Sequence, residues 1–466
     1  MDMDVYGKLV ETGYSLLSDW SSYKTWKYHR ELLANQYLPE AELRRLQWKR
    51  FSRIIRHAFE NVPFYTAKFK EAGIGPEDIH DPDAVSKIPF TTRKELMEAS
   101  AQAVIARGLS TRDLSLVETS GTSEGRPFRL FMDWDCLNRK YALLLRNYSY
   151  LGWQLGRKIM TLWNSAHEDY RPLRERSILK AVVYRFLHRK RWLPPFHKDS
   201  GLTDAKGLYY YERIRTFRPH LLEGDAFVLY RIGRFFQERN LVPQGIGAIS
   251  SAAGPTTSSI REELGRMFST RVYNNYGPHE MEGVACECSE QRGLHQSLDS
   301  YWIEFIRDGQ AAMTNELSEL VLTDLDNFAM PLIRYRIGDY LRAGSYPCTC
   351  GRTFPLMRDV EGRTTDALTT HRGVWTESRF QDFFGRFNLE NQFQVIEKNG
   401  RQIETRIVGS KNVDGAVLER IKAELKDLLG RDRAITVEWV DAIPCEPSGK
   451  FRLVKSMVSG TQDQLP

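Results

Sequence analysis

The sequence predicts an α/β protein with a large N-terminal domain of mixed sheets and helices, followed by a small, mobile α+β domain. Three observations carry this prediction: a mainly helical opening of about 110 residues, alternation of apolar runs and amphipathic helices in the middle, and a changed pattern after Asp366. The 466 residues are 41% hydrophobic, enough to bury large cores in two or three domains. We expect domains at 1–365 and 366–466.

Helical spacing organises the opening segment. Apolar side chains recur at roughly helical intervals from Leu43 to Ala58, and the Asn-Val-Pro sequence at 61–63 predicts the end of that helix. In the middle of the chain, the apolar runs 226–229, 245–249 and 319–322 alternate with amphipathic helices such as 258–268. This alternation predicts an α/β domain with substantial sheet.

The residues after Asp366 predict a compact unit. Residues 394–408 form two strand-like runs around Asn399-Gly400, which is a strong hairpin signal. Residues 414–429 place their apolar side chains on one helical face before Gly430, and 435–440 supply a further strand.

A loop rich in Ser, Thr and Gly lies between two strand-like runs at 117–131. Its backbone N–H groups and hydroxyls can converge on phosphate oxygens, while its glycines permit close approach. The residues concerned are Thr119, Ser120, Gly121, Thr122, Ser123 and Gly125. The loop lacks the Gly-Lys-Ser/Thr ending of a Walker loop, which disfavours P-loop NTPase chemistry. A hairpin loop without a ligand is the open alternative.

Further chemistry-bearing segments follow in a fixed order. Glu280 comes after a Tyr-Gly turn, where a carboxylate can hold Mg²⁺ against phosphate oxygens. A buried strand is predicted at 320–325, and beyond it Asp339 can accept hydrogen bonds from paired ribose hydroxyls. A Gly-Arg-Thr-Thr-Asp run at 362–366 and a Gly-Lys loop at 449–450 complete the set. Each segment alone is typical of an ordinary turn or surface ion pair. Their occurrence together in this order is a much more specific signal of function.

This ordered set resembles the adenylate-forming superfamily of acyl-CoA synthetases and adenylation domains, and is most similar to the branch of phenylacetate-CoA ligase and its capsule-locus (CapK-like) relatives. Residues 48–65 and 88–94 also resemble that branch. The resemblance implies an AMP-forming acid ligase: a carboxylate and ATP give an acyl-adenylate and pyrophosphate, and the acyl group then passes to a thiol or an amine.

The resemblance also implies individual roles. Lys450 and Glu280 would be catalytic, with Lys450 between the substrate carboxylate and the α-phosphate and Glu280 serving Mg²⁺ and the phosphates. Asp366 would be the hinge between the domains. The implied nucleotide-binding residues are Thr119, Ser120, Gly121, Thr122, Ser123, Gly125, Tyr276, Asp339 and Arg363.

Three positions depart from the usual pattern of the superfamily. Glu124 places a negative charge in the phosphate loop, Arg126 stands where Lys is usual, and His279 stands where Thr or Ser is usual. A non-catalytic scaffold that binds nucleotide or a partner is therefore an alternative, and retention of Lys450, Asp339 and Glu280 argues against it.

Four of the six cysteines fall in two close pairs, Cys286/Cys288 and Cys348/Cys350, with His295 after the first pair. Soft ligands from two loops suit Zn²⁺. The resemblance implies that Cys288, His295, Cys348 and Cys350 bind a structural zinc and that Cys286 is spare or competes. Buried thiols without metal are the alternative.

Charge and hydropathy limit the kinds of partner that the sequence predicts. A net charge of +6 gives little reason to invoke nucleic acid, no run approaches the ~20 apolar residues of a membrane span, and the first residues are acidic rather than basic. We expect a cytoplasmic enzyme. Basic residues flank an apolar stripe between Arg171 and Lys198, which predicts either a peripheral membrane or carrier-docking helix, or a core helix with a basic end.

The expected cofactors and partners follow from the resemblance. They are ATP, Mg²⁺, a small-molecule carboxylic acid and an acyl acceptor, with coenzyme A as the family's commonest choice. An amino group in polysaccharide biosynthesis is the alternative acceptor. The sequence predicts neither the identity of the acid nor the oligomeric state.

Overall fold

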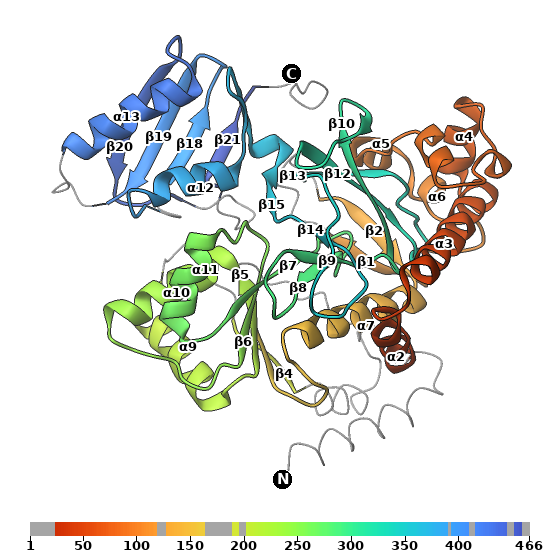
Figure 1. The fold of residues 1–466 in the computed structure, drawn as a ribbon, viewed down its shortest axis with the longest axis horizontal. Helices are drawn as coiled ribbons and strands as arrows, with labels where there is room; N and C mark the ends of the chain where they lie inside the picture. The colour runs from red at the N-terminus through yellow and green to blue at the C-terminus, as the bar shows by residue number, and fades with distance from the viewer. Residues whose placement is uncertain are drawn as a thin grey trace.

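The computed structural model describes residues 24–118, 127–163, 189–194, 202–389, 393–409, 415–444 and 452–458. The chain forms a large α/β lobe and a smaller C-terminal lobe (Figure 1). Both parts of the predicted fold class are present.

Helices make up most of the opening segment. They are α2 (Thr25–Asn35), α3 (Glu40–Asn61), α4 (Pro63–Glu71), α5 (Arg93–Glu98) and α6 (Ala101–Val104), with short 3-10 turns at Pro76–Asp78 and Asp83–Lys87. Helix α3 ends at Asn61, two residues before Pro63, because proline cannot continue the hydrogen-bond ladder. The predicted helical opening is confirmed for the residues described.

A hairpin comes next. Strands β1 (Ser115–Glu118) and β2 (Arg129–Met132) pair antiparallel, and the last pair before the connecting loop is Glu118 with Arg129. The predicted phosphate loop thus joins two paired strands, although its residues 119–126 lie outside the described part of the chain.

An eight-stranded sheet forms the centre of the large lobe. Its order is β14-β9-β8-β7-β6-β5-β3-β4, and its parallel strands are β4 (Lys190–Trp192), β3 (Ile159–Leu162), β5 (Leu221–Asp225), β6 (Ala248–Ala252) and β7 (Val272–Tyr276). The antiparallel strands are β8 (Ala285–Glu287), β9 (Leu294–Gln296) and β14 (Leu356–Met357).

Helices cover both faces of the parallel strands. Leu222, Ile249 and Val272 pack with α9 (Asp204–Phe217), α10 (Ala226–Glu238) and α11 (Ser258–Phe268). Leu221, Ala248 and Tyr273, one residue away on each strand, pack instead with α7 (Trp134–Tyr150). The alternation follows from the two-residue period of a strand.

The apolar run 226–229, which the sequence analysis contrasts with the amphipathic helices, is itself helical, because it opens α10. The side chain of Asp225 accepts hydrogen bonds from the backbone N–H groups of Phe227 and Val228, and so caps the helix. The prediction of a helix at 258–268 is confirmed, and the apolar run at 245–249 overlaps the start of strand β6.

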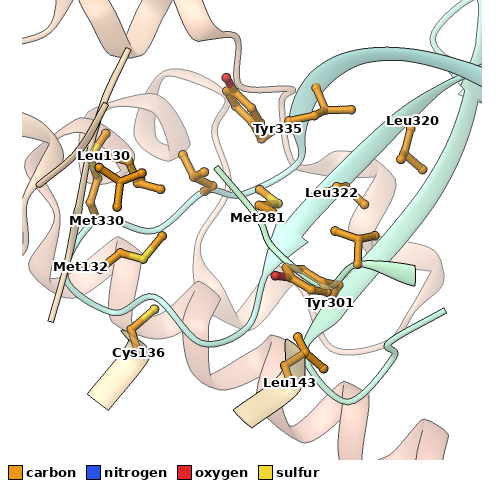
Figure 2. Packing of buried hydrophobic residues seen from close by; sticks show 14 of the residues in the cluster. Leu130, Met132, Cys136, Leu143, Met281, Tyr301, Leu320, Leu322, Met330 and Tyr335 are labelled. Carbon is orange, nitrogen blue, oxygen red and sulfur yellow. The ribbon is translucent and has the colours of Figure 1, made fainter. Parts of the chain in front are cut away.

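A five-stranded antiparallel sheet packs beside the first, in the order β11-β10-β12-β13-β15. Its strands are β10 (Tyr301–Arg307), β11 (Gln310–Ala311), β12 (Leu317–Asp324), β13 (Tyr335–Arg342) and β15 (Val360–Arg363). Figure 2 shows the core that side chains of β2, α7 and β12 form together, including Leu130, Leu143 and Leu322.

The smaller lobe begins after a 3-10 turn at Thr364–Asp366. It contains the small hairpin β16 (Leu368–Thr370)–β17 (Gly373–Trp375) and a sheet of order β20-β19-β18-β21. That sheet is formed by β18 (Phe393–Glu397), β19 (Gln402–Val408), β20 (Ala434–Val440) and β21 (Val454–Ser456), with α12 (Glu377–Gly385) and α13 (Gly415–Leu429).

The hairpin, helix and strand predicted after Asp366 are all present. A separate hydrophobic core, whose buried members run from Leu368 to Val454, holds this lobe together. The boundary between residues 365 and 366 itself stays a prediction.

Candidate functional site

The site lies where the carboxyl end of β7 meets strands β13 and β15. Tyr276 ends β7, and its hydroxyl donates a 2.6 Å hydrogen bond to Asp339 Oδ2. Asp339 and Arg363 are direct partners across β13 and β15, with Arg363 Nε 3.3 Å from Asp339 Oδ1. The structure therefore brings together Tyr276, Asp339 and Arg363, which are far apart in the sequence.

Burial and charge define the electrostatics of this group. Asp339 is only 7% exposed. Burial raises the pKa of Tyr276 well above its usual value, and the Asp339 charge raises it further, so this phenol stays a hydrogen-bond donor. The pKa of Arg363 is raised mainly by Asp339 and also by Glu280, which places the charge of Glu280 in the same group.

Glu280 lies in the turn that follows β7 and is 3% exposed. Its ion-pair partner within the described part of the chain is Arg93, at 3.5 Å between Nη1 and Oε1. This distance is at the limit of a hydrogen bond. A buried carboxylate with so loose a partner can accommodate a further cation.

Sequence reasoning missed Arg93. This residue opens α5, whose first turn is closed by a reciprocal pair of hydrogen bonds between Thr92 and Glu95. The capping box fixes the start of the helix and so points the Arg93 side chain toward Glu280. The run at 88–94 was recognised only as a family resemblance, and nothing in it distinguishes Arg93 from a surface cation.

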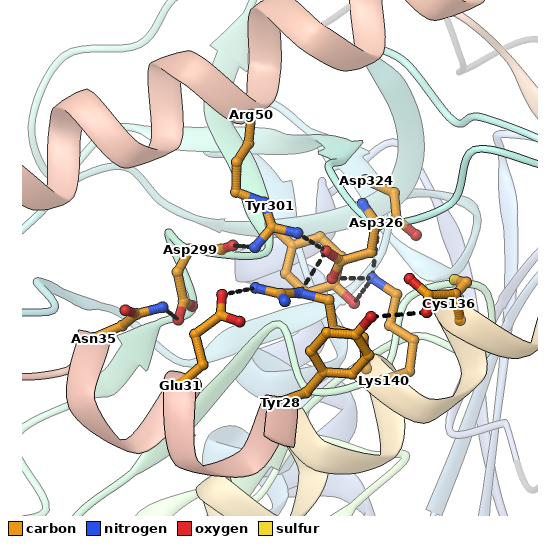
Figure 3. Close-up of polar contacts among 12 residues, drawn as sticks. Tyr28, Glu31, Asn35, Arg50, Cys136, Lys140, Asp299, Tyr301, Asp324 and Asp326 are labelled. Carbon is orange, nitrogen blue, oxygen red and sulfur yellow. Dashed lines mark hydrogen bonds and ion pairs between the residues drawn. The ribbon is translucent and has the colours of Figure 1, made fainter. Parts of the chain in front are cut away.

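A buried polar network supports the turn that carries Glu280. Lys140 of α7 is completely buried and its Nζ lies 2.6 Å from Asp324 and 2.9 Å from the Tyr301 hydroxyl (Figure 3). The same hydroxyl donates a 2.6 Å bond to the carbonyl oxygen of Glu282, two residues after Glu280. Asn147, also on α7, donates a 3.2 Å bond to the carbonyl of Gly283. Asn147 of α7, and Tyr301 next to Lys140 of α7, therefore hold the backbone carbonyls of this turn.

The predicted hinge residue lies at the junction of the lobes. Asp366 is buried and forms an ion pair with Arg452, which lies two residues beyond Lys450. Burial raises the pKa of Asp366, and the Arg452 charge opposes that rise. Burial, and then the Asp366 charge, raises the pKa of Glu377 to about 8. Sequence reasoning assigned no role to Arg452 or Glu377.

Two predicted parts of the site lie outside the described residues. They are the phosphate-loop residues Thr119, Ser120, Gly121, Thr122, Ser123 and Gly125, and the catalytic candidate Lys450. The basic segment from Arg171 to Lys198 also lies largely outside. Within the described chain, no helix is long and apolar enough to cross a membrane.

A second constellation lies between β8, β9 and the loop before β14. The ligand atoms of Cys288, His295, Cys348 and Cys350 all lie within 4.8 Å of one another. The Nδ1 of His295 is 2.8 Å from the carbonyl oxygen of Phe354, so Nδ1 donates there and Nε2 faces the thiols, 3.3 Å from Cys350. Cys286 turns away and contacts the carbonyls of Asn147 and Glu287. The four residues expected as ligands are therefore the four that converge.

A large α/β lobe followed by a smaller lobe, with acidic and basic side chains gathered at strand ends beside a hairpin, fits the architecture of the adenylate-forming ligases. The comparisons agree. The chain is similar to 2-hydroxyisobutyryl-CoA ligase in the postadenylation state, with a TM-score of 0.73, 17% identity and 91% of each chain covered. The same ligase in the thioesterification state gives a TM-score of 0.61.

Comparison with sequence relatives indicates which adenylate-forming ligases the chain is most similar to. The family model of the CapK C-terminal domain matches residues 368–457. The chain is 25% identical to the phenylacetate-coenzyme A ligase of Thermus thermophilus, over 90% of this chain and 97% of that protein. It is 22% identical to the protein CapK of Staphylococcus aureus, over 88% of each. The resemblance to phenylacetate-CoA ligase and CapK that the sequence predicts is confirmed as a similarity over most of the chain, and the structural similarity shows the fold of an adenylate-forming ligase.

Proposed function

We propose that this protein activates a carboxylic acid with ATP, releases pyrophosphate, and transfers the acyl group from the acyl-adenylate to coenzyme A. The observation that carries the proposal is the convergence of Tyr276, Asp339, Arg363 and Glu280 at the strand ends. Relatives named as coenzyme A ligases over most of the chain support it.

The nucleotide would be held by this group. The Asp339 carboxylate is fixed by Tyr276 and Arg363 through one contact on each oxygen, and each oxygen retains a lone pair that a ribose hydroxyl can use. Arg93 and the hydroxyls of the β1–β2 loop would contact the phosphates. The loose ion pair of Glu280 fits Mg²⁺, which would neutralise phosphate charge when bound.

Lys450 would supply the positive charge between the reactants. A carboxylate and a triphosphate repel each other, and a fixed ammonium lowers that cost through position and electrostatics without forming a covalent bond. The Arg452–Asp366 ion pair supports this role, because it holds the chain two residues beyond Lys450 at the junction of the lobes.

The test is exchange of labelled pyrophosphate into ATP by the wild type and by Lys450→Ala. The variant is expected to lose nearly all exchange and to keep the wild-type unfolding transition. Near-normal exchange by the variant would contradict the assigned role.

The acceptor is tested by product analysis. After pyrophosphate release is established, coenzyme A and amines are supplied separately, and thioester and amide are measured. Thioester formation supports coenzyme A. Amide formation alone would favour the alternative, acylation of an amino group in polysaccharide biosynthesis, which the CapK relationship motivates. Pyrophosphate exchange itself excludes a non-catalytic scaffold.

The Cys/His constellation would hold a structural Zn²⁺. Three thiols and one imidazole complete a tetrahedral shell and leave no position for a substrate, while the Phe354 carbonyl fixes the imidazole tautomer. Metal analysis after purification without chelator should give one zinc per chain. Active protein without zinc would remove this assignment. Cytoplasmic location, and contact of the basic segment with a membrane, stay predictions.

A further inference from the structure

A row of polar side chains crosses the sheet on the face that α7 covers. Thr161, Glu223 and Ser250 are direct neighbours in register on β3, β5 and β6. The residues two positions earlier on these strands, Ile159, Leu221 and Ala248, pack in the apolar core with α7. The face therefore changes from apolar to polar as the strands approach their carboxyl ends, where the proposed nucleotide site begins.

Glu223 is a buried anion at the centre of this row. Its carboxylate accepts hydrogen bonds from the Tyr148 hydroxyl at 2.5 Å, from Lys190 Nζ at 3.2 Å and from Thr161 Oγ1 at 3.3 Å. Only 5% of the residue is exposed. An isolated buried carboxylate is costly, and these three donors offset that cost.

Two more polar groups on this face are buried without a partner. Within the described residues, neither Ser250 Oγ nor Asn275 Oδ1 has a hydrogen-bond partner, although Ser250 is 0% and Asn275 8% exposed. Asn275 lies on β7 next to Tyr276 and is two residues beyond Tyr273, which shares the α7 face. Buried polar atoms are normally satisfied, so these two indicate a ligand that supplies hydrogen bonds.

The balance of charge and of donors indicates the nature of that ligand. Lys190 balances Glu223, but Glu282 has no cation within ion-pair distance among the described residues. Burial, and then the Glu223 charge, raises the pKa of Glu282 to about 8, so a bound cation beside it would favour its carboxylate form. Carboxylate and amide oxygens only accept hydrogen bonds, and an ammonium group only donates them. A cationic amine therefore matches this surface better than a hydroxyl or an apolar group.

From this we infer that the carboxylic acid activated by this protein carries a cationic amino group, which binds at the strand ends between Glu223, Ser250 and Asn275 of the sheet and Glu282 of the turn. The inference rests on the proposed function. It distinguishes this chain from a ligase for an acid with a purely apolar body, because such an acid would leave all of these acceptors without a donor.

The experiment compares acids that differ only in the amino group. The pairs are 6-aminohexanoate and hexanoate, alanine and propionate, and 4-aminophenylacetate and phenylacetate. The aromatic amine of 4-aminophenylacetate is weakly basic and uncharged at neutral pH, so this pair shows the effect of an amino group without a positive charge. For each acid, kcat/KM is measured for pyrophosphate release. In at least one pair with an alkylamine, the amino acid should be preferred by about tenfold or more, since a site built for a polar group rejects the analogue that lacks it.

Two variants and a control locate the effect. Ser250→Ala and Glu282→Gln should each reduce the preference for the amino acid, mainly through a higher KM. Ser251→Ala is the matched control, because Ser251 is the next residue along β6, faces away from α7, and already bonds to Thr256 at 2.9 Å. It should leave the ratio between the paired acids as in the wild type.

The outcomes separate the two claims. Pyrophosphate release with the apolar acids and no preference for any amino acid would overturn the inference and leave the proposed function intact. A preference that survives both variants would overturn the assigned residues. Absence of pyrophosphate release with every acid tested would contradict both claims.

Discussion

Replacement of Tyr301 by Phe tests how the turn carrying Glu280 is held. The change keeps the buried ring and removes one oxygen, which accepts from Lys140 at 2.9 Å and donates to the Glu282 carbonyl at 2.6 Å. Lys140 keeps its ion pairs with Asp324 and Asp326 (Figure 3), so the buried ammonium stays compensated. The Glu282 carbonyl loses its donor.

The magnitude follows from that loss. A buried acceptor left without a donor costs about 1–3 kcal/mol. If that cost falls on the turn conformation that binds Mg²⁺, the Mg²⁺ concentration for half-maximal pyrophosphate exchange rises by roughly tenfold, since 1.4 kcal/mol is one decade. The variant should still fold, because the hydrophobic contacts of the ring are kept.

The assay is pyrophosphate exchange at a series of Mg²⁺ concentrations with ATP in excess. Tyr210→Phe is the matched control: Tyr210 lies on α9 and is equally buried, and its hydroxyl donates a 3.0 Å bond to the carbonyl of Pro194, not to the turn. Both variants should lose a little stability, and only Tyr301→Phe should shift the Mg²⁺ requirement. An unchanged Mg²⁺ requirement in Tyr301→Phe would refute the reasoning.

Three further predictions concern other parts of the site. Arg93→Ala should raise the KM for Mg-ATP in the exchange assay by about tenfold, the scale of a charge-assisted hydrogen bond, with partial recovery in Arg93→Lys; equal KM values would exclude phosphate binding by Arg93. Burial, and then the Asp366 charge, raises the pKa of Glu377 to about 8, so the stability that Glu377 contributes is complete below its unfolded pKa near 4.5 and is lost as the pH rises through 8. Glu377→Gln should therefore lose less stability than the wild type between pH 5 and 8 in thermal unfolding, and parallel curves would contradict this. Removal of zinc by a chelator should lower the unfolding temperature of the wild type. The chelator should not change the unfolding temperature of Cys350→Ser, because this variant should already lack the metal. An unchanged unfolding temperature of the wild type would argue against a structural zinc.

Many residues of the candidate site could be predicted, because they lie in short segments whose residue types indicate their chemistry. Asp339 follows a glycine in a strand, Glu280 follows a Tyr-Gly turn, and both roles depend on residue type and order rather than on distant packing. The possibility of a metal site could also be predicted, since two Cys pairs and a histidine suit a metal. The four that converge in the structure are those that the resemblance implies.

The remainder depends on contacts between segments far apart in the chain. Lys140 pairs with Asp324 across 184 positions, and no local pattern marks either residue as a partner of the other. Arg93 meets Glu280 only because α5 is placed against the strand ends. The apolar run at 226–229 fits the period of a strand and that of a helix, and capping by Asp225 favours the helix.

The products of ATP cleavage test the central claim most directly. In the presence of an accepted acid and Mg²⁺, the wild-type protein should form AMP and pyrophosphate in equal amounts, and formation of both should depend on the acid. Formation of ADP and inorganic phosphate, or cleavage of ATP that no carboxylic acid stimulates, would contradict activation through an acyl-adenylate.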